Sequence, residues 1–319
     1  MRLWDCVVCG ETCLDVVAGP LPLDEPLAHR GLIPLSALHA VTGGIVPNAG
    51  LALARWGLRV AGLALVGQDD WGRIIRQRLV NAGIDTTDVV THPTLASSVT
   101  LVLVGRDREH TFAFQAGASQ QIDRRFLLDR LPRFAQAHYA LIGYYHLLPQ
   151  LEADLPEVMA AIRETGCRTA LDTTNGGGSL DPLRHILPHL DLYVPSWAEA
   201  RQQTGESEPR RILAVYRQHA PQAILGVKLG AQGAVLSPPD GDCQWIAPVE
   251  PPGPVVDTTG AGDCFYAGLI AGLVRGWSLQ DAGRLAAAAG ACCVTGLGAT
   301  AALRGFDETW QLATRPRSS

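Results

Sequence analysis

Short apolar runs alternate with amphipathic stretches through the middle of the chain. The runs have the length and the β-branched content of buried strands, and the stretches between them have the period of helices. The pattern predicts strands at residues 138–143, 167–172, 191–194 and 221–229, with helices at residues 151–165, 183–187 and 198–203. Strands and helices in turn predict an α/β fold, in which helices cover both faces of a mostly parallel sheet.

The N-terminal third has a different pattern. Residues 4–10 form a Val-rich run typical of a buried strand, whereas apolar and polar positions alternate over residues 11–17, which indicates a half-exposed sheet. Asp15 is one of the polar members of that alternation. Residues 21–39 are rich in Pro and Leu without a period and read as a loop or as part of a lid. Between residues 88 and 114, strands such as residues 98–104 alternate around a charged turn, which predicts a hairpin.

Two stretches of small residues predict helices that approach other groups closely. Gly43 and Gly44 open a helix that Gly57 ends, and Asn48 in its first turn offers a donor and an acceptor. Asp69 precedes a second helix, which begins near Trp71, and is placed to cap it. Helices rich in Ala and Gly are expected at residues 267–274 and 285–294.

Composition excludes several classes of protein. Hydrophobic residues make up 47% and charged residues 18% of the 319 residues, which is typical of a globular protein. The net charge of −5 and the lack of a basic stripe argue against a nucleic-acid partner. There is no signal-peptide segment and no apolar run of about 18 residues, so we expect a cytoplasmic protein without a membrane span.

The eight cysteines do not predict a metal site. Cys6 and Cys9 are spaced as C-x-x-C, but residues three apart on a strand point to opposite faces and cannot share a metal ion. We expect all of the cysteines to be reduced and structural.

The stretch from Val255 to Gly268 predicts an anion site, because a β-branched run passes into a helix through Gly260-Ala261-Gly262. The unpaired amides of the first helical turn and the helix dipole favour a phosphate there. Asp263 follows in that turn, and a base beside such amides suits phosphoryl transfer to an alcohol. The structural alternative is a helix capped near residues 257–259. No Walker-type loop occurs.

The string D-T-T-G-A-G-D at residues 257–263 resembles the signature D-T-x-G-A-G-D of the PfkB-type carbohydrate kinases in the ribokinase-like family. The Gly-Gly pair, Asn48 and V-G-Q-D-D-W-G at residues 66–72 resemble that family's first signature. The resemblance spans residues 4–304. It implies one ribokinase-like domain over residues 1–319, a three-layer α/β/α sandwich with a small β lid formed by residues 12–40 and 96–115.

The resemblance also implies an active site that uses ATP and Mg²⁺, with K⁺ as a further candidate ion. Asp263 is then the general base, and the amides of Gly260, Ala261 and Gly262 form the anion hole. The other implied site residues are Asp15, Gly43, Gly44 and Asn48 on the substrate; Lys228, Gly230, Gly233, Thr258 and Gly298 on the nucleotide; Glu199 on Mg²⁺ through water; and Asp257 on a monovalent cation.

Two positions depart from the family pattern. Ile45 stands where ribokinase has a Lys after the Gly-Gly pair, which argues against ribose as the substrate. Ser196 replaces the Asn of the family motif N-x-x-E, so Ser196 and Glu199 can also be read as a capping box at the start of a helix.

We therefore expect an ATP-dependent kinase of a small sugar, with a homodimer through the lid as a candidate assembly. A nucleoside kinase of the adenosine, inosine or pseudouridine type is an alternative, for which Trp71, Tyr144 or Tyr145 could form the slot for the base. A non-catalytic sensor of sugars or nucleotides would keep the pocket without the chemistry.

Overall fold

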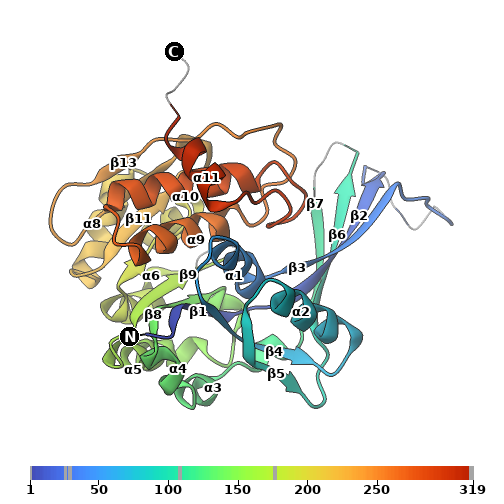
Figure 1. The fold of residues 1–319 in the computed structure, drawn as a ribbon, viewed down its shortest axis with the longest axis horizontal. Helices are drawn as coiled ribbons and strands as arrows, with labels where there is room; N and C mark the ends of the chain where they lie inside the picture. The colour runs from blue at the N-terminus through green and yellow to red at the C-terminus, as the bar shows by residue number, and fades with distance from the viewer. Residues whose placement is uncertain (1, 25–26, 28–30, 107–109, 175–177, 316–319) are drawn as a thin grey trace.

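The computed structural model describes residues 2–24, 27, 31–106, 110–174 and 178–315 (Figure 1). Most of the predicted turn after residue 105, and parts of the predicted lid segments, therefore lie outside the described residues.

A nine-stranded sheet forms the middle layer (Figure 1). Seven neighbouring strands, from β11 (Ile224–Lys228) to β5 (Asp85–His92) at one edge, run parallel. At the other edge, β12 (Ala234–Ser237) and β13 (Gln244–Ile246) pair antiparallel. In spatial order the strands are β13 (Gln244–Ile246), β12 (Ala234–Ser237), β11 (Ile224–Lys228), β10 (Leu192–Tyr193), β9 (Arg168–Asp172), β8 (Ala137–Gly143), β1 (Trp4–Gly10), β4 (Val60–Gly67) and β5 (Asp85–His92).

Helices cover both faces of this sheet, which confirms the predicted three-layer α/β/α arrangement. One face carries α1 (Ile45–Arg55), α2 (Asp70–Asn81), α9 (Ala261–Val274) and α10 (Leu279–Cys293), with α11 (Phe306–Ala313) at its margin. The other carries α3 (Arg124–Leu128), α4 (Leu131–Ala135), α5 (Leu155–Glu164), α6 (Leu180–Ile186), α7 (Trp197–Thr204) and α8 (Pro209–His219).

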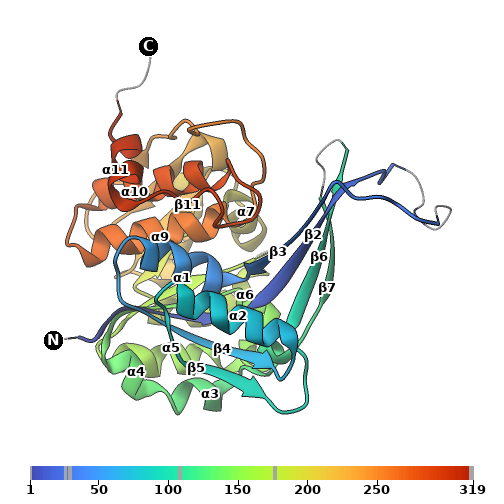
Figure 2. The same ribbon diagram turned by 45° about the vertical axis from the view of Figure 1, so that its right-hand side comes forward.

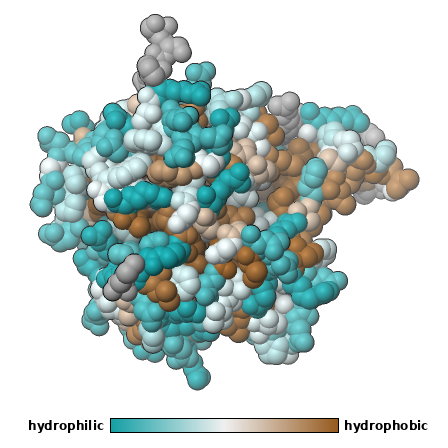
Figure 3. Space-filling model, in the orientation of Figure 1, coloured by the Kyte–Doolittle hydropathy of each residue, from teal (hydrophilic) through white to brown (hydrophobic). Residues whose placement is uncertain are grey.

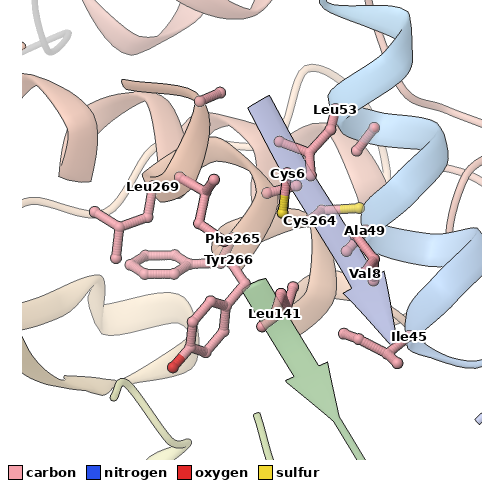
Figure 4. Close-up of a cluster of buried hydrophobic side chains, with 14 of the residues drawn as sticks. Cys6, Val8, Ile45, Ala49, Leu53, Leu141, Cys264, Phe265, Tyr266 and Leu269 are labelled. Atoms are coloured by element: carbon pink, nitrogen blue, oxygen red, sulfur yellow. The ribbon is translucent and has the colours of Figure 1, made fainter. Parts of the chain in front are cut away.

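The first of these faces contains the core that positions the predicted anion site. Figure 4 shows Cys264 of α9 beside Cys6 and Val8 of β1 and Ala49 of α1, with Phe265 and Leu269 of α9 farther from α1. The side chains of these residues are almost completely buried. Since α9 contains small and apolar residues along its length, it packs closely on all sides, and its N-terminus is held in place relative to α1.

The cysteines behave as the sequence predicts. All eight are free thiols, and Cys6 and Cys9 belong to the cores on opposite faces of the sheet. Among the described residues, no cluster of three or more His, Cys, Asp or Glu side chains could hold a metal ion. Within that same part of the chain, the helices are too short or too polar to cross a membrane.

A separate four-stranded sheet projects from the body of the protein (Figure 2). Its order is β3 (Ala37–Gly43), β2 (Cys13–Leu21), β6 (Ser98–Gly105) and β7 (His110–Gln115). We call it the small sheet. Its strand pairing places Phe112 and Phe114 on the face that carries Asp15, and Leu38 and Leu101 on the opposite face.

The structure corrects three sequence expectations. Residues 37–43 form a strand although the loop was expected to reach residue 39, because pairing with β2 imposes the extended conformation. Strand β5 joins the large sheet rather than the hairpin that follows it. The strand predicted at residues 221–229 is not the last strand of the large sheet, because β12 and β13 follow it in an antiparallel meander.

Glu11 lies where the chain passes from β1 in the large sheet to β2 in the small sheet. Its side chain is only 1% exposed. Burial raises the pKa of this carboxyl to about 7, and the nearby hydroxyls of Ser98 and Ser119 offset only part of that effect. The folded protein therefore holds a proton on Glu11 that the unfolded chain releases at lower pH.

We expect Glu11→Gln to stabilise the protein above pH 7. A carboxyl whose pKa is raised on folding contributes stability at low pH that is lost as the pH rises through the folded value of about 7. Gln carries no charge, so the free energy of unfolding at pH 8 should rise by on the order of 2 to 3 kcal/mol. Urea unfolding at pH 5 and pH 8 measures this.

The matched control is Glu164→Gln, because the Glu164 side chain is exposed at the end of α5. A gain for Glu11→Gln that is the same at both pH values would contradict a titrating buried carboxyl.

Candidate active site

The N-terminus of α9 is open. Its N-cap is Gly260, which has the left-handed backbone angles φ 76° and ψ 1° that favour glycine. No side chain among the described residues caps this helix, so the predicted structural alternative of a cap at residues 257–259 is wrong. Amides of the first turn therefore remain available to an anion.

A close contact requires glycine at position 260, whereas Gly262 leaves room beside the flexible end of Lys228. A Cβ atom on Gly260 would lie 2.1 Å from the Cβ atom of Ala299. A Cβ atom on Gly262 would lie 3.1 Å from the Lys228 Nζ atom. The amide of Ala261 donates to the Thr258 carbonyl at 3.3 Å, so one of the three amides assigned to the anion hole is already engaged.

Asp263 is buried beside Asn48. Its side chain is 2% exposed, and its Oδ2 atom accepts a hydrogen bond of 2.8 Å from the Asn48 Nδ2 atom of α1. Tyr144 follows β8, and its hydroxyl donates to the same Oδ2 atom at 2.6 Å. Burial raises the pKa of Asp263, and these two donors offset part of the effect. The sequence prediction that Asn48 and Asp263 share one site is consistent with this contact.

Lys228 places a positive charge next to these groups. Its Nζ atom lies 3.2 Å from the Oδ1 atom of Asp172, at the C-terminal end of β9. Burial raises the pKa of Asp172 to about 7, although Lys228 acts in the opposite direction. The surrounding carboxylates Asp172, Glu199 and Asp263 together raise the pKa of Lys228 despite its own burial. Lys228 therefore remains a cation in this site.

Glu199 and Ser196 form the capping box of α7. The Ser196 amide donates to Glu199 Oε2 at 2.7 Å, and the Ser196 hydroxyl accepts from the Glu199 amide at 3.4 Å. Glu199 is still close enough to Asp263 for its charge to raise the pKa of that carboxyl. The capping role is thus present in the structure, and the carboxylate also faces the charged cluster.

Asp15 lies at the base of the small sheet. Its Oδ1 atom accepts from the Cys13 thiol at 3.2 Å, and burial raises its pKa. A Cβ atom on Gly43 would lie 2.1 Å from Asp15 Oδ2, and one on Gly44 would lie 2.3 Å from the carbonyl oxygen of Glu11. Gly43 therefore allows β3 to pass directly beside the Asp15 carboxylate, and Gly44 allows the start of α1 to pass beside the backbone of Glu11.

Asp257 organises the loop before α9. Its carboxylate accepts from the amides of Thr259 and Gly298, each at 2.8 Å, and its side chain is 6% exposed. His110 of the small sheet approaches it, with 3.8 Å between Nδ1 and Oδ1. Thr258 is exposed on the same loop. The small sheet thus touches the segment that leads into the open helix.

A cavity of about 670 Å³ borders the cluster. Its lining includes Ser196 and Lys228 as well as Gly230, Trp197 and Trp245. Gly230 has the left-handed φ of 58° and faces this space.

Gly233 does not line the cavity. It is buried, and a Cβ atom there would lie 2.1 Å from the carbonyl oxygen of Ile246 in β13. Gly233 therefore serves the packing of the turn against β13.

Sequence reasoning missed the contact of Tyr144 with Asp263 and the pairing of Asp172 with Lys228. Tyr144 follows β8 and Asp172 ends β9, both at the C-terminal edge of the sheet where sites gather, and that was the available signal. Two adjacent tyrosines could not be told apart in sequence. The structure buries Tyr145 completely in the opposite core, which removes it from any slot for a base.

Comparison with known proteins identifies the kind of molecule. Residues 5–304 match the model of the pfkB family of carbohydrate kinases. The chain belongs to this family. It is accordingly a phosphotransferase with an alcohol group as acceptor.

Relatives of this pfkB family protein include kinases of sugars and of a riboside. It is 30% identical over 277 residues to aminoimidazole riboside kinase of Salmonella typhimurium, covering 82% of this chain and 84% of the relative. It is 26% identical over 281 residues to ribokinase of Haemophilus influenzae, covering 84% of this chain and 85% of the relative.

The fold has close structural counterparts. The structure of Arabidopsis thaliana ribokinase complexed with ribose and ATP superposes with a TM-score of 0.83 at 21% identity. The match covers 99% of this chain and 100% of the ribokinase chain. This confirms the predicted ribokinase-like α/β fold, with its large mostly parallel sheet and its small separate sheet.

Proposed function

We propose that this protein transfers the γ-phosphoryl group of ATP to a hydroxyl group of a small carbohydrate. Asp263 is the general base, and the backbone amides of Gly260, Ala261 and Gly262 stabilise the charge on the transferred group, the amide of Ala261 after it leaves the Thr258 carbonyl. The other roles follow the sequence prediction: Asp15, Gly43, Gly44 and Asn48 contact the acceptor, and Lys228, Gly230, Gly233, Thr258 and Gly298 contact or frame the nucleotide.

The observation that carries this proposal is the position of Asp263. A carboxylate that is 2% exposed lies in the first turn of a helix whose N-terminus no described side chain caps. The contact with Asn48 joins it to a helix from the other end of the chain. Base and anion-binding amides are therefore held together on packed helices, as transfer to an alcohol requires.

The chemical step follows from these contacts. The acceptor hydroxyl gives its proton to Asp263 while its oxygen forms a bond to the γ-phosphorus. The bond from that phosphorus to the β–γ bridging oxygen breaks, and ADP leaves with the electron pair. The amides and the Lys228 ammonium offset the negative charge on the transferred group.

The charge balance of the site fits a divalent cation. Burial raises the pKa of Asp172 and of Asp263, the negative charge of Glu199 adds to both effects, and the Lys228 ammonium opposes them. No cluster within the described residues suits direct coordination, which supports the role of Glu199 in holding Mg²⁺ through water. When bound, Mg²⁺ would neutralise charge on the phosphates.

A nucleoside kinase is the second candidate. The relative with 30% identity is named for a riboside, and Phe112 and Phe114 lie half exposed on the same face of the small sheet as Asp15. These two rings could form the aromatic slot for the nucleoside base, in place of the buried Tyr145. The non-catalytic sensor is set aside, because the chain belongs to a kinase family and retains Asp263.

We also propose that the small sheet acts as a lid and that its outer face joins two copies of the chain in the cytoplasm. Leu38 is 63% and Leu101 39% exposed on the face opposite Asp15. Figure 3 shows apolar surface on this projecting part of the molecule. Exposed apolar patches of this kind mark association surfaces, and an open sheet also leaves edges to cover.

Replacing Asp263 with Asn tests the proposed reaction. Asn keeps the shape of the side chain but accepts no proton, so turnover should fall by about 10²- to 10⁴-fold, the usual contribution of a general base. The affinity for ATP should remain nearly unchanged. ADP release with a panel of sugars and nucleosides measures turnover, and calorimetry measures nucleotide binding.

The control is Asp70→Asn, because Asp70 also lies in the first turn of a helix but its side chain is 77% exposed. Wild-type turnover in the Asp263→Asn variant, or no acceptor-dependent ADP release by the wild-type protein with any member of the panel, would refute the assignment.

A monovalent cation is proposed at the loop that Asp257 holds. Because this carboxylate already accepts two amides, the loop carbonyls are the groups that would bind K⁺. Turnover should then rise several-fold when K⁺ replaces Na⁺ at constant ionic strength. Equal rates in the two salts would remove the cation from the site.

The proposed dimer is tested by charging the outer face of the small sheet. Leu38→Asp together with Leu101→Asp should convert a dimer to a monomer in sedimentation velocity, because an unpaired charge is costly in an apolar interface. Leu3→Asp is the control, since Leu3 is 47% exposed outside the small sheet. A wild-type protein that sediments as a monomer at all concentrations would exclude this assembly.

A further inference from the structure

Both hydrogen bonds to Asp263 end on the same oxygen. The Tyr144 hydroxyl lies 2.6 Å and the Asn48 Nδ2 atom 2.8 Å from Oδ2. No described side chain donates to Oδ1. The carboxylate therefore has one oxygen that is fixed by two donors and one that remains free.

The backbone places Tyr144 in this position at a cost. Tyr144 has φ 60° and ψ 39°, and it is the one non-glycine residue with positive φ among the described residues. The left-handed conformation costs roughly 1–2 kcal/mol for a residue with a Cβ atom. Its amide donates to the Asp172 carbonyl at 3.0 Å, and its carbonyl accepts from Leu147 at 2.8 Å. Backbone strain that is maintained by neighbouring contacts, as at Tyr144, is typical of residues in functional sites.

This turn separates two adjacent tyrosines. The side chain of Tyr145 enters the core on the α5 face of the large sheet, whereas that of Tyr144 packs against the opposite core and reaches Asp263. A regular strand would also send neighbours to opposite faces, but Tyr144 lies beyond the end of β8, where only the left-handed turn directs it.

The Tyr144 hydroxyl can act only as a donor toward Asp263. Burial raises the pKa of Tyr144 well above its ordinary value, and the negative charge of Asp263 adds to the effect. The phenol therefore keeps its proton whenever the carboxylate is ionised. It stabilises the ionised form of Asp263 without competing for the proton that the acceptor releases.

We propose that Tyr144 is a positioning residue for the general base: its hydroxyl, with Asn48, ties down Oδ2 of Asp263, so that Oδ1 is the atom that takes the proton from the acceptor. This inference rests on the proposed function, because it assigns the reacting oxygen of the same carboxylate.

The charges that also face Asp263 are those of Lys228 from β11, Glu199 from α7 and Asp172 from β9. A change at Tyr144 that removes only the hydroxyl leaves all three in place. Any shift in the titration of Asp263 can then be assigned to the lost hydrogen bond.

Tyr144→Phe is the test. The ring is retained and one donor to a buried carboxylate is lost, so the acid limb of the kcat profile should move to higher pH by about one unit. On the plateau, kcat should fall roughly 3- to 10-fold because Asp263 is held by one donor instead of two, while the KM for ATP stays the same.

A second measurement does not need turnover. The carboxyl carbon of Asp263, assigned in ¹³C-labelled protein by its loss in Asp263→Asn, should titrate about one pH unit higher in Tyr144→Phe than in wild type. If this shift occurs but no acceptor is phosphorylated, the proposed kinase reaction fails, and only the hydrogen bond from Tyr144 to the Asp263 carboxylate is confirmed.

Tyr145→Phe is the matched control, because it removes the neighbouring hydroxyl in the opposite core and should change neither the acid limb nor the titration. Two results would overturn the inference. One is a Tyr144→Phe protein with an unshifted acid limb and carboxyl titration. The other is a lower KM for the acceptor while the acid limb and the carboxyl titration stay unchanged. The phenol would then only occupy space that the acceptor needs.

Discussion

The arrangement depends on a buried carboxylate at the open end of a buried helix. Asp263 loses hydration that only a few partners can replace, and it finds them in the Asn48 amide and the Tyr144 hydroxyl. Those partners come from α1 and from the exit of β8, so this one group links three parts of the fold. The dense packing of α9 among small residues keeps the link rigid.

The charged residues around it form one system. Lys228 stays protonated because three carboxylates surround it, and Asp172 has a pKa of about 7 because burial outweighs its pairing with Lys228. Such a cluster is costly in a structural core and is typical of a site that exchanges charge with a ligand. Phosphates entering the cluster would meet the Lys228 ammonium and the open amides of α9 together.

Under the proposed function, substrate specificity would reside in the small sheet. Asp15 stands at its base, Phe112 and Phe114 extend the same face, and His110 reaches the loop that Asp257 shapes. In the proposed reaction, the N-terminus of α9 and the groups at the edge of the large sheet would handle the phosphoryl group. The side chains of the small sheet would distinguish one acceptor from another, so phosphoryl handling and substrate choice would reside in separate parts of the chain.

Sequence by itself determined the α/β class, the mostly parallel direction of the central strands and the family, because periodicity and the string from Asp257 to Asp263 are local properties of the chain. It also singled out Asn48 and Asp263 before they were known to touch. It did not determine that β3 begins at Ala37, that two antiparallel strands follow β11, or that Tyr144 rather than Tyr145 reaches the carboxylate. Those features were decided only by the tertiary structure, because they depend on contacts between residues far apart in the chain, which no local pattern records.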